Sequence, residues 1–177
     1  MIETHGLTGR VIAGNMDCEP SMVKAGRILI EKGVFTHLGC GCHRIECVTG
    51  LVFDGPGVKK PMAHACALVA RCTKSIQASD RLVELCGTVG IAPLKVLQGV
   101  ETRWWSTYAM VERLLYLRRV VEVHESVDFI EPMVETVDWS VSEMLEPVLS
   151  PFMYVQKKLE SNNVTEGSVV PLICELR

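Results

Sequence analysis

The chain has 177 residues, of which 48% are hydrophobic, and a formal net charge of -3. Its length and apolar content suffice for one large domain, or parts of two, with a real core. The slightly acidic balance excludes a chain-wide basic field that would hold a nucleic-acid backbone, so we expect any DNA contact to be local.

The chain has eight cysteines, but its first residues lack the basic and apolar stretches of a signal peptide. We therefore expect reduced thiols inside a cell rather than disulfides in a secreted protein. Every apolar segment is interrupted by Lys, Arg, Glu or Pro well before the roughly 20 residues that a membrane span needs. No membrane association is expected.

The first fifty residues show an alternation of strands and helices. Residues 9–16 have the pattern of a short buried strand, and residues 18–32 carry apolar side chains at helical spacing. Gly33 is a plausible helix stop, residues 34–41 form a second short strand, and another helix starts near His43. This region is predicted to be α/β.

After the turn residues Asp54-Gly55-Pro56-Gly57 the pattern becomes helical, and the whole chain is predicted to be mostly helical. Pro147 and Pro151 are expected to kink or split the helix in which they lie. The predicted helices cover residues 58–78, 79–89, 103–125, 127–136, 139–161 and 168 onward.

The stretch from Glu122 to Glu146 has eight acids and neither Lys nor Arg. A solvated face of a surface helix is the simpler interpretation. The alternative is a docking face for a basic protein partner. In both cases the stretch is not expected to touch DNA. The acids are Glu122, Glu125, Asp128, Glu131, Glu135, Asp138, Glu143 and Glu146.

The segment from Glu101 to Leu115 reads ETRWWSTYAMVERLL. It resembles the TRWNST signature, followed by YxMLERLL, of hAT-superfamily transposases and their zinc-finger BED-type relatives. The resemblance implies that Trp104 stacks on an extruded DNA base and that Arg103 meets a phosphate. Trp105 stands where the family has Asn. The alternative is that both tryptophans anchor a helix bundle through their large apolar area.

Asp17 falls at a junction between a strand and a helix, where an isolated Asp most often caps the helix. The segment that follows resembles the family pattern TDNxxNMVKA, and MVKA matches at residues 22–25. The resemblance places Asp17 on the family's metal-binding aspartate. In an RNase H-like fold such carboxylates bind two Mg²⁺ ions at the scissile phosphate.

Cys40 and His43 match the CxxH motif of the same family, which implies that His43 lies beside the acidic site and approaches the phosphate. The residues alone equally suggest zinc ligands at Cys40, Cys42, His43 and Cys47, with His37 as a further candidate. Zinc is not expected, because no second ligand pair follows at finger-like spacing. We expect small, buried apolar roles for Cys47, Cys66, Cys72, Cys86 and Cys174.

Residues 137–173 resemble the family stretch DW…L.PF…VLPLI, so the resemblance runs from about Gly6 to Arg177. It predicts two domains. Residues 1–53 correspond to a partial RNase H-like core, and residues 54–177 to a helical insertion that is truncated at its C-terminal end. The fold class is thus an α/β fragment followed by an all-α part.

The family cleaves DNA with three carboxylates, and this chain begins after the first and ends before the last. Neither a BED-type zinc finger nor the dimerisation segment falls within it. We therefore predict a truncated or degenerate transposase-like protein, nuclear and catalytically inactive, without functional Mg²⁺ and with residual nucleic-acid binding. The alternative is a domesticated protein-interaction module that uses the helical bundle and its acidic face. Oligomeric state and recognised DNA sequence stay open.

Overall fold

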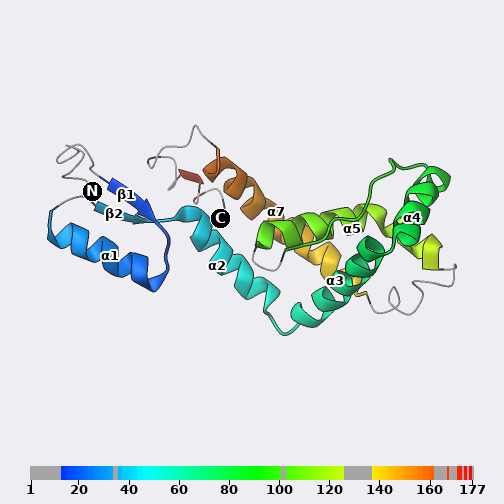
Figure 1. The fold of residues 1–177 in the computed structure, drawn as a ribbon, viewed down its shortest axis with the longest axis horizontal. Helices are drawn as coiled ribbons and strands as arrows, with labels where there is room; N and C mark the ends of the chain where they lie inside the picture. Colours follow the sequence, from blue (N-terminus) through cyan, green and yellow to red (C-terminus); the bar gives the residue numbers. More distant parts are fainter. Residues whose placement is uncertain are drawn as a thin grey trace.

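A computed structural model describes residues 13–33, 36–100, 103–125 and 137–161, and single positions from 167 onward. This part of the chain is mostly helical, as predicted, with one two-stranded sheet. Figure 1 shows the sheet and its helix at one end of an elongated molecule and a group of helices at the other. None of the described helices combines the length and apolar character needed to cross a bilayer.

The sheet consists of β1 (Ala13–Met16) and β2 (Thr36–Gly39), which pair in parallel with Ala13 opposite Thr36 and Met16 opposite Gly39. The predicted strands extend into residues that lie outside the described ranges. Because the strands are parallel, their carboxyl ends meet at the same edge of the sheet. Residues that follow β1 and β2 are therefore brought together.

Helix α1 (Pro20–Glu31) connects the two strands and packs on β2. Pro20 occupies the first turn, where its missing N–H costs nothing. The carboxylate of Glu19 accepts a hydrogen bond from the Ser21 N–H at 3.2 Å. Gly33 has φ of 66°, a left-handed conformation that glycine adopts freely, and this agrees with the predicted stop after α1.

Helix α2 (Gly41–Phe53) leads from the sheet to the other helices. It starts directly after Cys40, whose N–H donates to the Met16 carbonyl at 2.8 Å and so continues the strand pairing up to the helix. Ile45, on its inner face, is only 4% exposed. Helix α2 contacts both α5 and α7, which fixes the sheet to the helical part of the molecule.

The boundary between the next two helices differs from the prediction. Helices α3 (Lys59–Lys74) and α4 (Ile76–Val89) meet at Ser75, not after Ala78. The hydroxyl of Ser75 accepts from the Ala78 N–H at 3.2 Å, which is the capping role that favours serine at a helix start. Continuous helical periodicity across the junction hid this cap.

Helix α5 (Trp104–Glu125) is central, since it packs against α4, α7 and α2. Its buried side chains face several neighbours, as expected for a helix covered on more than one side. They are Trp104, Tyr108, Met110, Val111, Leu114, Leu117, Val120 and Val121. The loop from residue 91 to 100 is held on this helix, because Arg113 donates to the Lys95 carbonyl at 2.8 Å.

Helix α7 (Trp139–Leu159) runs unbroken past Pro147 and Pro151. Of the two outcomes expected at these prolines, a kink or a split, the split does not occur. Each proline removes one hydrogen bond within the helix, but Leu145, Leu149 and Met153 are buried against the neighbouring helices and hold the backbone in place. The helices predicted at residues 127–136 and from 168 onward fall outside the described ranges or at isolated positions within them.

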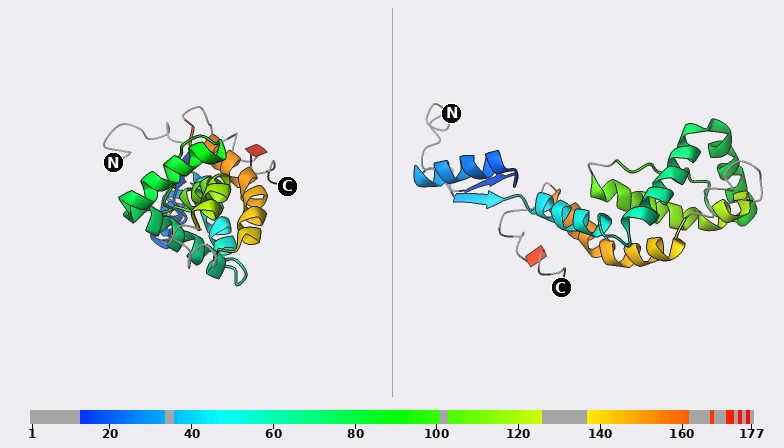
Figure 2. Two further views of the ribbon diagram at one scale, coloured as in Figure 1. Left: turned by 90° about the vertical axis from the view of Figure 1, so that its right-hand side faces the viewer. Right: turned by 90° about the horizontal axis from the view of Figure 1, so that it is seen from below.

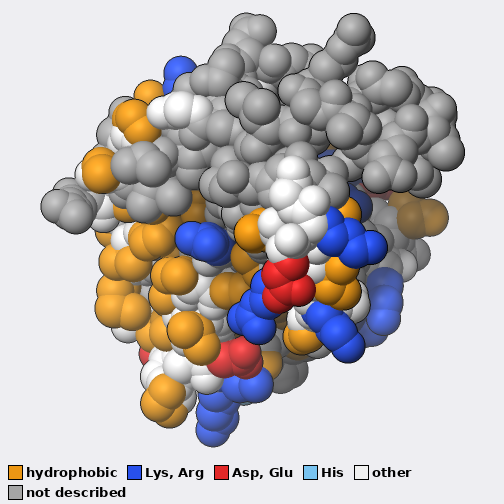
Figure 3. Space-filling model, turned by 90° about the vertical axis from the view of Figure 1, so that its left-hand side faces the viewer, with side chains coloured by type: hydrophobic (Ala, Val, Ile, Leu, Met, Phe, Trp, Pro, Cys, Tyr) orange, Lys and Arg blue, Asp and Glu red, His pale blue; other side chains and the backbone are white. Residues whose placement is uncertain are grey.

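The hydrophobic core is formed by the helices from α2 onward; every buried hydrophobic side chain in the described part follows Gly41. Figure 2 shows the group of helices on one side and the sheet with α1 projecting from it. On α1, Met22, Ile28 and Ile30 are exposed by 38 to 47%. Figure 3 views this end and shows hydrophobic side chains beside Lys and Arg.

Candidate functional site at the sheet edge

Two of the predicted clusters meet at the carboxyl edge of the sheet. Asp17 follows β1, and Cys40 and His43 lie at the end of β2 and in the first turn of α2. The His43 Nδ1 lies 3.3 Å from the Asp17 Oδ1. An open hollow of about 410 Å³ contains them, lined by Asn15, Met16, Asp17, Cys40, Cys42, His43 and Glu46.

A second carboxylate, that of Glu46, also lies near His43. The Glu46 Oε2 is 3.8 Å from the same Nδ1, one helical turn along α2. The imidazole therefore stands beside two carboxylates, and sequence reasoning missed Glu46 because nothing in the motif marks it. All three side chains are partly exposed, between 33 and 53%.

The donor set does not fit a Mg²⁺ ion. Magnesium prefers several oxygen ligands in octahedral geometry, whereas here both carboxylates lie near the His43 imidazole, and the remaining lining offers one side-chain amide oxygen, that of Asn15, beside sulfur atoms. Among the described residues, no group of three or more His, Cys, Asp or Glu is arranged to hold a metal ion. Cys40, Cys42, His43 and Cys47, the candidate zinc ligands, belong to the described residues, whereas the side chain of His37 lies outside them, so the absence of zinc stays a prediction.

Arg44 adds a cation to the same edge. Its guanidinium lies over the backbone of Gly39, where a Cβ placed on that glycine would be 2.8 Å from Nη2. The absence of a side chain at position 39 thus leaves room for Arg44 at the end of β2. Sequence reasoning did not single out Arg44, although it directly follows His43 in the CxxH segment.

The thiols of Cys40 and Cys42 lie close together in the first turn of α2. Burial raises the pKa of the Cys42 thiol to about 11, and Cys40 and the Glu160 carboxylate contribute to that increase. All eight cysteines are free. The expectation that five others are buried is correct for Cys72 and Cys86 but wrong for Cys47, Cys66 and Cys174, which lie on exposed faces of their segments.

Trp104 is an internal side chain in this structure, with 5% of its surface exposed. Its ring packs against Tyr108, with centroids 6.5 Å apart and planes at 59°. Its Nε1 has no hydrogen-bond partner among the described residues. Trp104 lines a hollow of about 660 Å³ that also includes Glu46, so Glu46 lines both this hollow and the Asp17 hollow.

Trp105, not Trp104, presents an aromatic ring to the surface, with 38% exposed. The Arg103 guanidinium lies 5.9 Å from its ring centroid, a cation–π contact. Trp105 lines a third hollow, of about 490 Å³, between α5 and α7. Adjacent residues on a helix point about 100° apart, so only the packing of α7 and α2 decides which of the two tryptophans is buried.

Ser106 holds the turn that delivers Arg103 to the start of α5. Its buried hydroxyl accepts from the Val100 N–H at 2.8 Å and donates to the Arg103 carbonyl, 2.7 Å away. The hydroxyl thus fixes the loop end and the first turn of the helix together. This positioning role explains why the ST dipeptide at residues 106–107 follows the aromatic pair.

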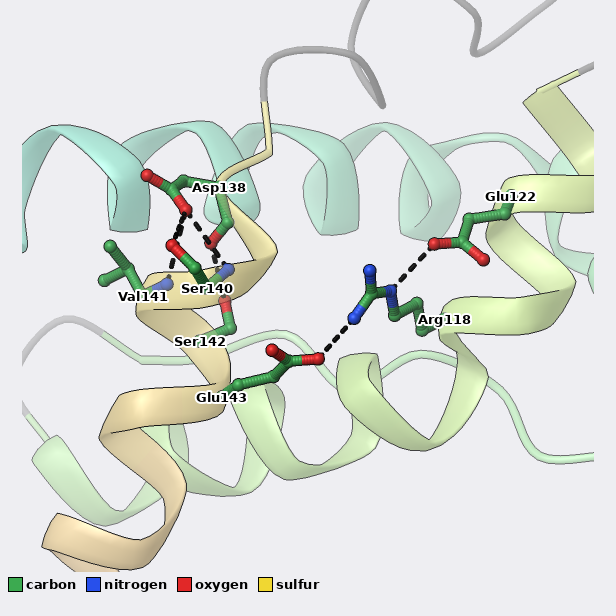
Figure 4. A network of polar contacts seen from close by, with 7 residues as sticks. All are labelled: Arg118, Glu122, Asp138, Ser140, Val141, Ser142 and Glu143. Atoms are coloured by element: carbon green, nitrogen blue, oxygen red, sulfur yellow. Dashed lines mark hydrogen bonds and ion pairs between the residues drawn. The ribbon is translucent and has the colours of Figure 1, made fainter.

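The described part of the acidic stretch is engaged within the chain. Figure 4 shows Arg118 between Glu122 and Glu143, and Asp138 at the start of α7. The Asp138 carboxylate accepts from the N–H groups of Ser140 and Val141 at 3.1 and 3.3 Å. Asp128, Glu131 and Glu135, and the side chain of Glu125, lie outside the described residues, so a docking role of this stretch stays a prediction.

Comparison with known proteins gives a distant match. The chain is 20% identical over 146 residues to human zinc finger BED domain-containing protein 4, an alignment that covers 81% of this chain and 12% of that protein. The chain thus spans about an eighth of this relative. No protein-family profile matches the chain, and no solved structure does. The similarity indicates a BED-related origin and does not identify a transposase.

Proposed function

We propose that this chain is derived from an hAT-type transposase and binds nucleic acid without cleaving it. The observation that carries the proposal is the meeting of Asp17, Cys40 and His43 at one edge of two parallel strands. The same meeting is implied by the resemblance of both segments to the transposase motifs. The distant similarity to a BED zinc-finger protein supports the same origin.

In this proposal residues 1–53 are part of an RNase H-like core, and residues 54–177 belong to its helical insertion. The strand order β1-α1-β2 and the parallel pairing support the first assignment. The uninterrupted helices from α3 onward support the second. By the same origin, the protein acts in the nucleus.

The residues at the sheet edge favour phosphate binding over phosphate cleavage. Arg44 and, when protonated, His43 offer cationic donors to a phosphate. The two carboxylates at this edge, Asp17 and Glu46, both lie near the His43 Nδ1, so the described residues do not present the set of free carboxylates that two-metal cleavage needs. These residues therefore bind and orient a nucleic-acid backbone. The negative charges of Asp17 and Glu46 weaken that binding.

The test is binding of the full chain to labelled hairpin DNA, measured by fluorescence anisotropy at two salt concentrations. We expect affinity to fall as salt rises, and no strand cleavage on a denaturing gel when Mg²⁺ is added. His43→Ala and Arg44→Ala should weaken binding, whereas Asp17→Asn should strengthen it by removing a repelling charge.

Arg81→Ala is the matched control, because Arg81 lies on α4, at the far end of the molecule from the sheet, in an ion pair with Glu84. Its loss removes the same charge without touching the sheet edge. Equal effects of Arg81→Ala and Arg44→Ala would contradict the site. Magnesium-dependent cleavage that Asp17→Asn abolishes would show a functional nuclease and contradict the proposal.

A further inference from the structure

The hollow between α5 and α7 has the composition of a stacking site. Its α5 wall consists of Trp105, Tyr108, Ala109 and Glu112. The α7 wall and the residue that follows it contribute Ser150, Met153, Tyr154, Lys157 and Glu160. At about 490 Å³, the hollow has room for a planar ring system of the size of a nucleobase.

Two exposed aromatic rings from different helices line this hollow. Trp105 is 38% exposed and Tyr154 is 51% exposed, so both rings are accessible without a rearrangement of the core. Large aromatic side chains that remain exposed offer stacking surface to unpaired bases of any sequence. Trp104, by contrast, is 5% exposed and cannot accept a base without leaving the core.

A basic side chain lies over each of the two aromatic rings. Arg103 Cζ lies 5.9 Å from the Trp105 centroid, and Lys158 Nζ lies 5.5 Å from the Tyr154 centroid. Lys157 lines the hollow itself. Aromatic rings next to Lys and Arg form the combination that binds single-stranded nucleic acid, since the bases stack while the cations meet the phosphates.

The two carboxylates of the hollow limit what enters it. Glu112 and Glu160 would repel a phosphate, and Glu160 is also held by the side-chain amide of Gln156 at 2.6 Å. A neutral base has no such penalty, and the phosphates on either side of it would lie nearer to Arg103 and Lys158. The charges therefore favour a base inside the hollow over a phosphate.

We propose that this hollow binds one unpaired nucleobase between Trp105 and Tyr154, and that Trp105 takes the stacking role expected of Trp104. The inference rests on the proposed nucleic-acid function. The hollow also lies near the sheet edge, because α7, which forms one of its walls, packs on α2, which carries Cys42 and His43. One strand can thus contact both places.

The experiment uses the full chain and a DNA duplex with a single bulged 2-aminopurine, compared with the same duplex fully paired. Stacking quenches 2-aminopurine fluorescence, so we expect quenching on binding of the bulged duplex. Trp105→Ala should reduce affinity for the bulged duplex by about tenfold and abolish the quenching. Tyr154→Ala should have a similar, smaller effect.

Trp105→Phe keeps an aromatic ring and should retain most of the affinity and the quenching, which separates stacking from a general loss of structure. Met144→Ala is the matched control: Met144 is 52% exposed on the same helix as Tyr154 but does not line the hollow. The affinity of the Met144→Ala variant for the bulged duplex should equal that of the wild type. Circular dichroism confirms that each variant is folded.

The outcomes separate the two proposals. Binding that depends on Arg44 but leaves 2-aminopurine unquenched, or is unchanged in Trp105→Ala, overturns the stacking site and leaves the proposed function standing. Failure of the wild type to bind any oligonucleotide overturns both. If an acidic peptide with aromatic residues binds instead, and Trp105→Ala abolishes that binding, the hollow is a peptide site and the inference is wrong.

Discussion

The imidazole Nδ1 of His43 lies 3.3 Å from the Asp17 Oδ1, a contact between the first turn of α2 and the end of β1. Both side chains are partly exposed, and exposed ion pairs contribute below about 1 kcal/mol to stability. We therefore expect His43→Gln and Asp17→Asn to change the midpoint of thermal unfolding little. A large decrease in thermal stability would mean that the pair is a structural element and not a ligand-binding one.

Ser106→Ala should destabilise the protein by about 1–3 kcal/mol, because it leaves the Val100 N–H without its partner, whereas the Arg103 carbonyl still accepts from the backbone N–H of residue 106. Urea unfolding followed by circular dichroism measures the difference. Ser161→Ala is the control, since the exposed Ser161 hydroxyl bonds only to the Lys158 carbonyl in the last turn of α7. Similar free energies for the two variants would contradict the positioning role of Ser106.

Stability should depend on pH through Asp138. Hydrogen bonds from Ser140 and Val141 lower the pKa of this carboxyl in the folded protein. The contribution of the ionised Asp138 to the free energy of unfolding is therefore fully present above the unfolded-state pKa of about 3.9. It is lost as the pH falls through the lower pKa of the folded state. Thermal unfolding between pH 2 and pH 6 should show a steeper acid-side decrease in the wild type than in Asp138→Asn, where the amide still caps but does not titrate.

Cys42 should react slowly with iodoacetamide. Its pKa of about 11 leaves roughly two-hundredfold less thiolate at pH 8 than a free cysteine of pKa near 8.5 has. Exposed Cys47 should be alkylated first, which peptide mass spectrometry resolves over time. The rate at Cys42 should rise when the pH is increased toward 10; a rate as fast as that of Cys47 at pH 8 would contradict the buried thiol.

The order of elements near Asp17 and His43 could be predicted from the sequence, because strand, helix and glycine stop each leave a local signal. The meeting of the two residues was expected from the family resemblance alone, because the parallel pairing that produces it was not predicted from the residues. The placement of Glu46 and Arg44 beside them could not be predicted, since it depends on the rotation of α2 about its axis. That rotation is set by contacts with α5 and α7, far along the chain.

The aromatic pair shows the same limit. Local sequence places both Trp104 and Trp105 in the first turn of α5, but it contains no information on which one the neighbouring helices cover. Pro147 and Pro151 are the converse case, since a strong local signal for a break is overridden by burial of the flanking side chains. In both cases tertiary packing decides, and single-residue preferences do not.

Helix α2 is the covalent link between the sheet and the helical core within the described residues, and every buried hydrophobic side chain described lies on α2 or beyond it along the chain. Within the described residues, β1 and β2 pack mainly on each other and on α1, so we expect that the chain does not unfold as one cooperative unit. Backbone amides of β1 and β2 would exchange with deuterium through local openings, while those of α5 would exchange only on global unfolding. Nucleic acid that bridges the sheet edge and the α5–α7 hollow would couple the two units and slow exchange in the strands.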